Sequence, residues 1–133
     1  MKLGDFFDSS EFGTDLTDQD LQNYFLLCEF VLNPVRNEFG VVNITSGKRT
    51  KEEQERLKKQ GYKPSETSQH LLGEACDFVC PYSYSRGGMG AVYSYIVQVL
   101  KHSGQLFWYR KKGHVHVGLS RYNIKGTQQV LDE

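Results

Sequence analysis

The stretch that decides the interpretation of this chain is Ser68-Gln69-His70-Leu71-Leu72-Gly73-Glu74-Ala75-Cys76-Asp77. It places an imidazole, His70, and a carboxylate, Asp77, seven residues apart, with a glycine and small or apolar residues between them. A second pair of imidazoles, His114 and His116, follows in a short apolar run. Two histidines and one aspartate can bind a zinc ion and leave one coordination position open for water. The pattern therefore predicts a metal site built from two distant segments.

Length and composition favour a single domain over residues 1–133. The hydrophobic content is 38% and the aromatic content 13%, which is ordinary for a chain that folds around its own core. Sixteen Lys and Arg residues balance sixteen Asp and Glu residues. This balance gives no one-signed field of the kind that binds nucleic acid, and no stretch approaches membrane-spanning length. We expect a monomer that neither binds nucleic acid nor inserts into a membrane.

Cysteine usage and the first residues predict a reduced protein made in the cytoplasm. Three cysteines are not a disulfide framework. On one strand, Cys76 and Cys80 would lie about 13 Å apart between Cα atoms, whereas a disulfide needs less than about 7 Å. Buried, reduced cysteines are expected. The N-terminus lacks the apolar run of a signal peptide, which predicts synthesis without export by that route.

Three helices are predicted. The first covers residues 17–39, with a wide apolar face and a kink or break at Pro34. The second, residues 51–60, is charged almost throughout and belongs at the surface, and the third covers residues 91–100. Before them, residues 1–16 form an arm that we expect to attach to the body through Phe6, Phe7 and Phe12.

Short apolar or β-branched runs predict four strands, over residues 41–46, 75–80, 105–109 and 114–119. The last two strands form a hairpin. Alternation places Asp77 on the face opposite Cys76 and Phe78. Residues 81–90 are expected to form a loop, and residues 120–133 carry little signal. We therefore predict an α+β fold in which a small antiparallel sheet packs against helices.

The hairpin would bring the two histidine segments together. His114 and His116 leave the same face of their strand, with Cα atoms about 7 Å apart. The valines beside them then face the core. With His70 and Asp77, four polar groups would converge on one cleft. A catalytic zinc site needs only three protein ligands, so the fourth imidazole is free to contact a water or a developing oxyanion.

Three motifs follow one another in the chain, Ser46-Gly47-Lys48-Arg49, Ser68-x-His70-x-x-Gly73-x-Ala75-x-Asp77 and His114-x-His116. In order, spacing and strand placement they resemble the zinc D-alanyl-D-alanine carboxypeptidase family, which includes phage endolysins that cut peptidoglycan peptides. The resemblance covers roughly residues 30–119. It implies the hedgehog/DD-peptidase-like fold and a single zinc peptidase domain.

The resemblance also implies a role for each matched residue. The Zn²⁺ ligands would be His70, Asp77 and His116. His114 would be the catalytic imidazole that assists water or stabilises the tetrahedral intermediate. Arg49 would contact a substrate carbonyl or carboxylate, a task that suits its planar guanidinium, and Ser68 would bind the substrate backbone. The implied reaction is hydrolysis of an amide in a peptidoglycan stem peptide or cross-link, with zinc as Lewis acid and activator of water.

Two positions depart from the family pattern. One branch of the family has a glutamate as general base three residues before the last ligand, where this chain has Gly113. The base is then His114 or a group that the sequence does not identify. Lys48 stands where an aromatic residue is common. The bond that is cut also stays open: D-Ala-D-Ala carboxypeptidase and L-Ala-D-Glu-type endopeptidase action use the same metal centre.

Other interpretations compete with this one. The domain could be a catalytically inactive wall-binding or virion structural module. Two histidines and a carboxylate also form the facial triad of non-haem iron oxygenases, although few strands and two long helices disfavour the barrel those enzymes use. Arg49 could simply pair with the acidic helix that follows it. For a peptidase without a signal peptide, a cell-wall substrate implies release by lysis or a holin, as in a phage or prophage.

Overall fold

The computed structural model describes residues 1–61, 70, 72–119 and 128–133. Its elements in chain order are the 3-10 helix η1 (Ser9–Glu11), α1 (Asp18–Leu27), the π-helix η2 (Cys28–Leu32), α2 (Asn33–Phe39), β1 (Asn43–Ser46), α3 (Lys51–Lys59), β2 (Ala75–Val79), the 3-10 helix η3 (Ser83–Arg86), α4 (Gly88–Gln98), β3 (Leu106–Tyr109), β4 (His114–Gly118) and β5 (Gln128–Leu131). The α+β class is confirmed. Among the described residues, no helix is long and apolar enough to cross a membrane.

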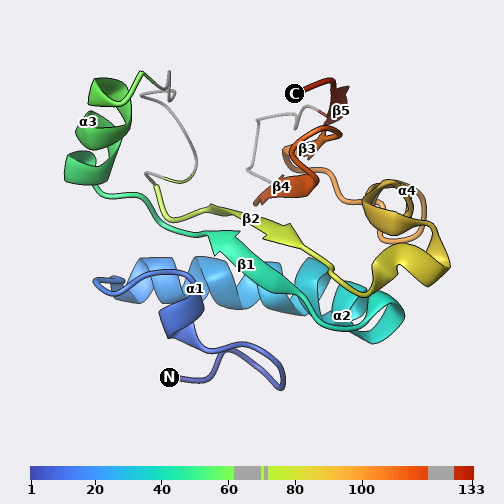
Figure 1. Ribbon diagram of the computed structural model, residues 1–133. Helices are drawn as coiled ribbons and strands as arrows, with labels where there is room; N and C mark the ends of the chain where they lie inside the picture. The colour runs from blue at the N-terminus through green and yellow to red at the C-terminus, as the bar shows by residue number, and fades with distance from the viewer. Residues whose placement is uncertain (62–69, 71, 120–127) are drawn as a thin grey trace.

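Five strands form one sheet in the order β1-β2-β4-β3-β5 (Figure 1). All neighbours are antiparallel except β3 and β5, which run parallel. The sheet is therefore mixed, and the prediction of an antiparallel sheet is wrong at this edge. The sequence Gln128-Gln129-Val130-Leu131 is largely exposed. An edge strand held mainly by backbone hydrogen bonds needs no apolar alternation, which explains why none marks it.

The long first helix is interrupted as its proline predicts. It begins at Thr17, whose hydroxyl accepts a hydrogen bond from the Asp20 amide at 3.1 Å. The helix changes to π-helical geometry over Cys28–Leu32, directly before α2. Pro34 lacks an N–H, and its ring crowds the carbonyl four residues earlier, at Phe30. The wider π turn removes that conflict, so α1, η2 and α2 continue along one side of the sheet (Figure 1).

The N-terminal arm attaches to the core by two of its three phenylalanines. Phe7 and Phe12 are buried, and the Phe12 ring stacks on Tyr24 of α1 with centroids 4.6 Å apart. Phe6 is 42% exposed and lies under the guanidinium of Arg36, 5.0 Å from its ring centroid. The arm is thus part of the folded body and lies against the segment that follows β1.

The three cysteines are free and buried, as predicted. Burial raises the pKa of the Cys28 and Cys80 thiols to about 12. These thiols are therefore protonated at neutral pH and belong to the core.

The sheet has one core face and one open face. The core face carries the buried side chains of Cys76, Phe78, Leu106, Val115 and Val117. Strand register fixes the other face, because residues directly opposite each other share a face. Asp77 lies opposite His116, which lies opposite Phe107. The predicted metal ligands of β2 and β4 are thus neighbours on the open face.

The segment after β2 is more ordered than predicted. Residues 81–90 contain η3 and the first turn of α4, so the expected loop is partly helical. Gly90 lets α4 approach β3, because a Cβ there would lie 2.6 Å from the Trp108 ring. Residues 81–90 show no apolar periodicity. The sequence therefore does not reveal where the helix begins.

Candidate metal centre

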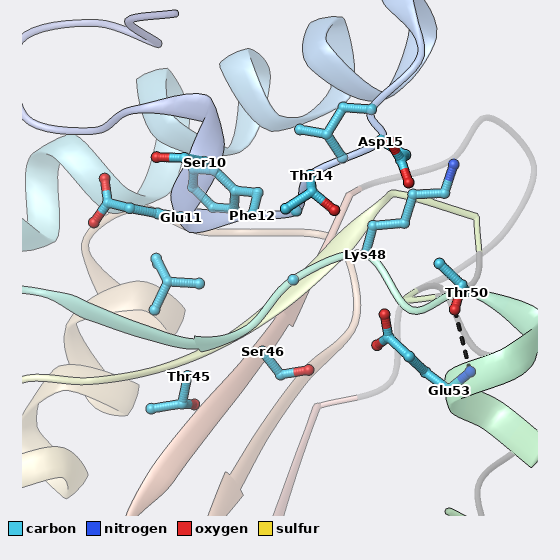
Figure 2. Close-up of a pocket in the computed structure, with 14 residues that line it drawn as sticks. Ser10, Glu11, Phe12, Thr14, Asp15, Thr45, Ser46, Lys48, Thr50 and Glu53 are labelled. Carbon is cyan, nitrogen blue, oxygen red and sulfur yellow. Dashed lines mark hydrogen bonds between the residues drawn. The ribbon is translucent and has the colours of Figure 1, made fainter. Parts of the chain in front are cut away.

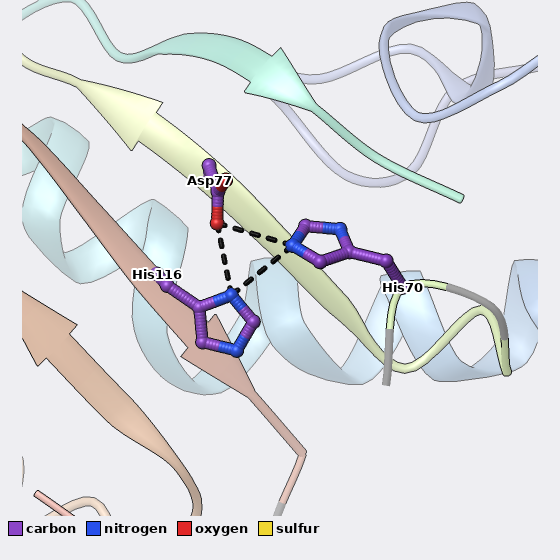
Figure 3. A group of neighbouring side chains, drawn as sticks. All are labelled: His70, Asp77 and His116. Atoms are coloured by element: carbon purple, nitrogen blue, oxygen red, sulfur yellow. Dashed lines mark hydrogen bonds and ion pairs between the residues drawn. The ribbon is translucent and has the colours of Figure 1, made fainter. Parts of the chain in front are cut away.

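Three side chains from separate segments meet on the open face of the sheet (Figure 3). His70 comes from the turn before β2, Asp77 from β2 and His116 from β4. The Asp77 Oδ1 atom lies 2.9 Å from His116 Nδ1 and 3.2 Å from His70 Nε2, and these two nitrogens are 3.1 Å apart. The His70 and His116 residues are at most 6% exposed. The group could hold a metal ion, and the predicted metal-binding set is confirmed at that level.

Hydrogen bonds on the far side of each ring decide which nitrogen faces the centre. His70 Nδ1 donates to the Gly47 carbonyl oxygen at 2.8 Å, and His116 Nε2 donates to Gln105 Oε1 at 2.7 Å. A neutral imidazole has one N–H and one lone pair. With the outer nitrogens protonated, His70 Nε2 and His116 Nδ1 present lone pairs to the centre. Such outer acceptors commonly orient histidines that bind metals.

The donor set fits a metal ion. Two nitrogen lone pairs and one carboxylate oxygen face one another at 2.9–3.2 Å. Without a cation between them, these atoms would repel. Zinc bonds of about 2.0–2.1 Å at tetrahedral angles separate ligand atoms by about 3.3 Å, which is close to the spacing found. Two imidazoles and a carboxylate suit zinc, and imidazole also suits iron, copper and nickel.

Asp77 is the anionic member of this group. Burial raises the pKa of its carboxyl, but hydrogen bonds and positive charge from the His116 and His70 imidazoles, in their protonated form, lower it by more. The pKa therefore lies well below its usual range, and the group is a carboxylate at neutral pH. A partly buried carboxylate of this kind needs adjacent positive charge, which a metal ion or protonated imidazoles would supply.

His114 lies beside the metal group rather than in it. Its Nε2 is 3.8 Å from Asp77 Oδ2, and its ring lies against Tyr109 with centroids 4.6 Å apart. Burial lowers the pKa of His114 below its ordinary value, and the opposing effect of Asp77 does not restore it. The imidazole is thus neutral at pH 7 and able to accept a proton. The side chain is still 22% exposed.

Two further residues of the predicted motifs, Lys48 and Arg49, follow β1. The Arg49 amide donates to the His70 carbonyl at 2.9 Å, so the backbone of the Ser46–Arg49 motif is tied to that of the His70 motif. Lys48 Nζ lies 2.6 Å from Asp20 Oδ2. Ser68 falls outside the described residues.

No family model, curated protein or solved structure matches this chain. The hedgehog/DD-peptidase resemblance therefore stays a prediction.

Two residues of the site were missed by the sequence analysis. Gln105 orients His116, but a single glutamine before a strand has no motif that reveals it. Phe107 stacks on His116, with ring centroids 5.4 Å apart and planes inclined by 22°. Its place was predictable in principle, since Phe107 alternates with the buried Leu106 along a predicted strand.

A cleft of about 340 Å³ lies between the N-terminal arm and the end of β1 (Figure 2). Its lining is rich in hydroxyl and carboxyl groups, from Ser10, Glu11, Thr14, Asp15, Thr45, Ser46, Thr50 and Glu53. Ser46 also stands opposite Asp77 in the sheet register. The cleft therefore includes the β1 residue that pairs with one member of the metal group.

Proposed function

We propose that this protein is a zinc metallopeptidase that hydrolyses an amide bond in peptidoglycan stem peptides or cross-links, with a hedgehog/DD-peptidase-like fold. One observation carries the proposal. Two inward lone pairs and a carboxylate converge at 2.9–3.2 Å, with a fourth, neutral imidazole beside them. The order of the three sequence motifs supplies the substrate class.

In this proposal, bound zinc supplies a Lewis acid for the amide carbonyl and an activated water. His114 takes the role of general base, because Gly113 has no side chain where one branch of the family has glutamate. Its lowered pKa keeps the imidazole in the form that accepts a proton, and the resulting imidazolium can donate that proton to the leaving amine. Arg49 and Ser68 would hold the substrate carboxylate and backbone.

Two other functions are weaker. A catalytically inactive wall-binding or virion structural module would keep the metal group without using His114. A non-haem iron oxygenase would be expected on a double-stranded barrel, whereas the described strands form one mixed sheet. The proposal leaves two reactions in contention, D-Ala-D-Ala carboxypeptidase and L-Ala-D-Glu-type endopeptidase.

Digestion of purified sacculi tests the function and names the bond. The protein should bind about one zinc and release peptides, which mass spectrometry of the muropeptides assigns to one cleavage position. His114→Ala should still bind zinc but lose at least about 100-fold in rate, since general acid–base groups contribute 10²–10⁴-fold. His102→Gln is the matched control, because His102 bonds to the Gly118 carbonyl and is not a member of the metal group. Zinc binding without cleavage in the wild type would support the wall-binding module.

A further inference from the structure

A buried carboxylate on α1 contacts both the segment after β1 and the turn that carries His70. Asp20 is only 4% exposed, and its Oδ2 lies 2.6 Å from Lys48 Nζ. Asp20 also fills the space beside Gly73, where an added Cβ would lie 2.8 Å from the Asp20 Cγ atom. The Gly73 amide donates to the His70 carbonyl at 3.3 Å. One side chain thus links the segment after β1 to the turn that carries a metal ligand.

The segment after β1 in turn fixes the orientation of the His70 ring. The peptide group between Gly47 and Lys48 forms two hydrogen bonds. Its carbonyl accepts one from His70 Nδ1 at 2.8 Å, and its N–H donates one to the Phe12 carbonyl at 2.7 Å. The Lys48 side chain starts next to this peptide group, and its Nζ atom contacts Asp20. Asp20 therefore reaches His70 by two routes, through the Lys48 side chain and through the turn at Gly73.

We propose that the Asp20–Lys48 ion pair is a positioning device that holds His70 with its Nε2 toward Asp77 and His116, ready for the metal ion. Asp20 and Lys48 are positioning residues; neither touches the metal group. The proposal rests on the metal site of the proposed function, not on its substrate. It also gives a role to a lysine where the family commonly has an aromatic residue.

Energetics separate this role from a purely structural one. An intact ion pair between shielded groups adds little net stability, because desolvation offsets the Coulombic gain, but removing one partner alone leaves the other charge unpaired and destabilises the fold. Groups that orient metal-binding histidines, in contrast, typically change metal affinity by 10–100-fold. Removing the Lys48 charge also leaves the Asp20 carboxylate unpaired and should lower stability, so the metal affinity of the folded protein is the readout that separates the two roles. Asp20 is the less clean target, because its carboxylate also accepts the Thr17 amide at the start of α1.

The test compares metal affinity with stability in the full chain. Lys48→Met should lower zinc affinity about 10–100-fold in competition with a chelator and alter the visible spectrum of the Co²⁺-substituted protein. Its metal-free form should be less stable than the wild type, because Asp20 is left unpaired, so both readouts are taken well below its unfolding midpoint, where the variant is folded. Lys48→Arg keeps a charged donor and should restore both readouts. Lys59→Met, an exposed lysine on α3, is the matched control. Lys48→Gln replaces Lys48→Met if the latter aggregates.

The outcomes are distinguishable. If the wild type binds zinc and Lys48→Met binds it equally well with an unchanged Co²⁺ spectrum, the positioning role is wrong and the proposed function stands. If the wild type binds neither zinc nor Co²⁺, the proposed function and the positioning role both fail. Adding Asp20→Asn to Lys48→Met should cost little more affinity than the single change, because both remove the same link.

Discussion

The imidazole of His116 is oriented by a side chain that lies outside the metal group. Gln105 Oε1 accepts the proton on His116 Nε2, which leaves Nδ1 to face Asp77. Gln105→Leu removes this acceptor at similar volume and should lower zinc affinity about 10–100-fold. Gln105→Glu, which keeps an acceptor, is the control. Equal affinities of Gln105→Leu and wild type, measured by chelator competition, would contradict this role.

Gly47 is fixed by the backbone of the N-terminal arm. A Cβ at this position would overlap the Phe12 carbonyl and lie 2.6 Å from its Cα, and backbone atoms cannot move aside as a flexible side chain does. We expect Gly47→Ala to destabilise the fold by at least about 1–3 kcal/mol, as overpacking does, and to weaken zinc binding by displacing the acceptor of His70.

Urea unfolding and zinc titration of Gly47→Ala measure the two effects separately. Gly61→Ala is the control, because an added Cβ there meets nothing within 4 Å and only its positive φ of 89° is strained. A Gly47→Ala variant no less stable than Gly61→Ala would show that the arm adapts easily.

Asp20 makes stability depend on acid pH. Burial raises the pKa of this carboxyl, but hydrogen bonds from Lys48 and Thr17 lower it by more, so the folded-state pKa is below 3.8. A lowered carboxyl pKa gives stability that is present above the unfolded pKa and lost as pH falls through the folded value. The stability difference between wild type and Asp20→Asn should therefore be largest near pH 7 and shrink below about pH 4.

Denaturant unfolding of the metal-free proteins at several pH values measures this difference. Asp132→Asn, at an exposed C-terminal residue, provides the comparison for a general charge effect. A difference that stays constant from pH 7 to pH 3 would mean that the carboxylate of Asp20 is not stabilised in the folded state.

At the scale of elements, α1 is the support on which the chain before β2 rests. Asn23 Nδ2 donates to the Gly73 carbonyl at 3.2 Å, and the Tyr24 hydroxyl donates to the Ala75 carbonyl at 2.9 Å. Tyr24→Phe keeps the stack on Phe12 but leaves the buried Ala75 carbonyl without this donor. The expected loss is about 1–3 kcal/mol in unfolding free energy. Tyr82→Phe, at a side chain 71% exposed, should have no measurable effect on the urea midpoint.

The same elements show what local patterns predict. Alternation in Gln105–Tyr109 and His114–Leu119 predicted the hairpin, and the register pairs Tyr109 with His114 as a short turn requires. Pro34 predicted the interruption of the first helix because its chemistry acts on its own turn. The parallel pairing of β5 was not predictable, since backbone hydrogen bonds carry it and its side chains are mostly exposed.

At the scale of the whole molecule, the metal ligands were easier to predict than the groups that orient them. His70, Asp77 and His116 belong to residue types and spacings with few other uses. Gly47 acts through its carbonyl, which every residue has, and Asp20 acts from a helix fifty residues before His70. Such support depends on tertiary contacts that leave no local pattern in a single sequence.

Because the three ligands come from segments that are distant in the chain, metal binding should stabilise the whole fold. A ligand that binds only the folded state adds RT ln(1 + [L]/Kd), about 2.7 kcal/mol at a free concentration 100 times Kd. For a chain of 133 residues, this corresponds to a rise in Tm of about 10 °C. Calorimetry with buffered zinc should show the rise, and a chelator should reverse it. His116→Ala should abolish the zinc-dependent rise, whereas His102→Gln should keep it. An identical zinc-induced shift in His116→Ala would mean that zinc binds elsewhere on the protein, and would overturn the assignment of the site.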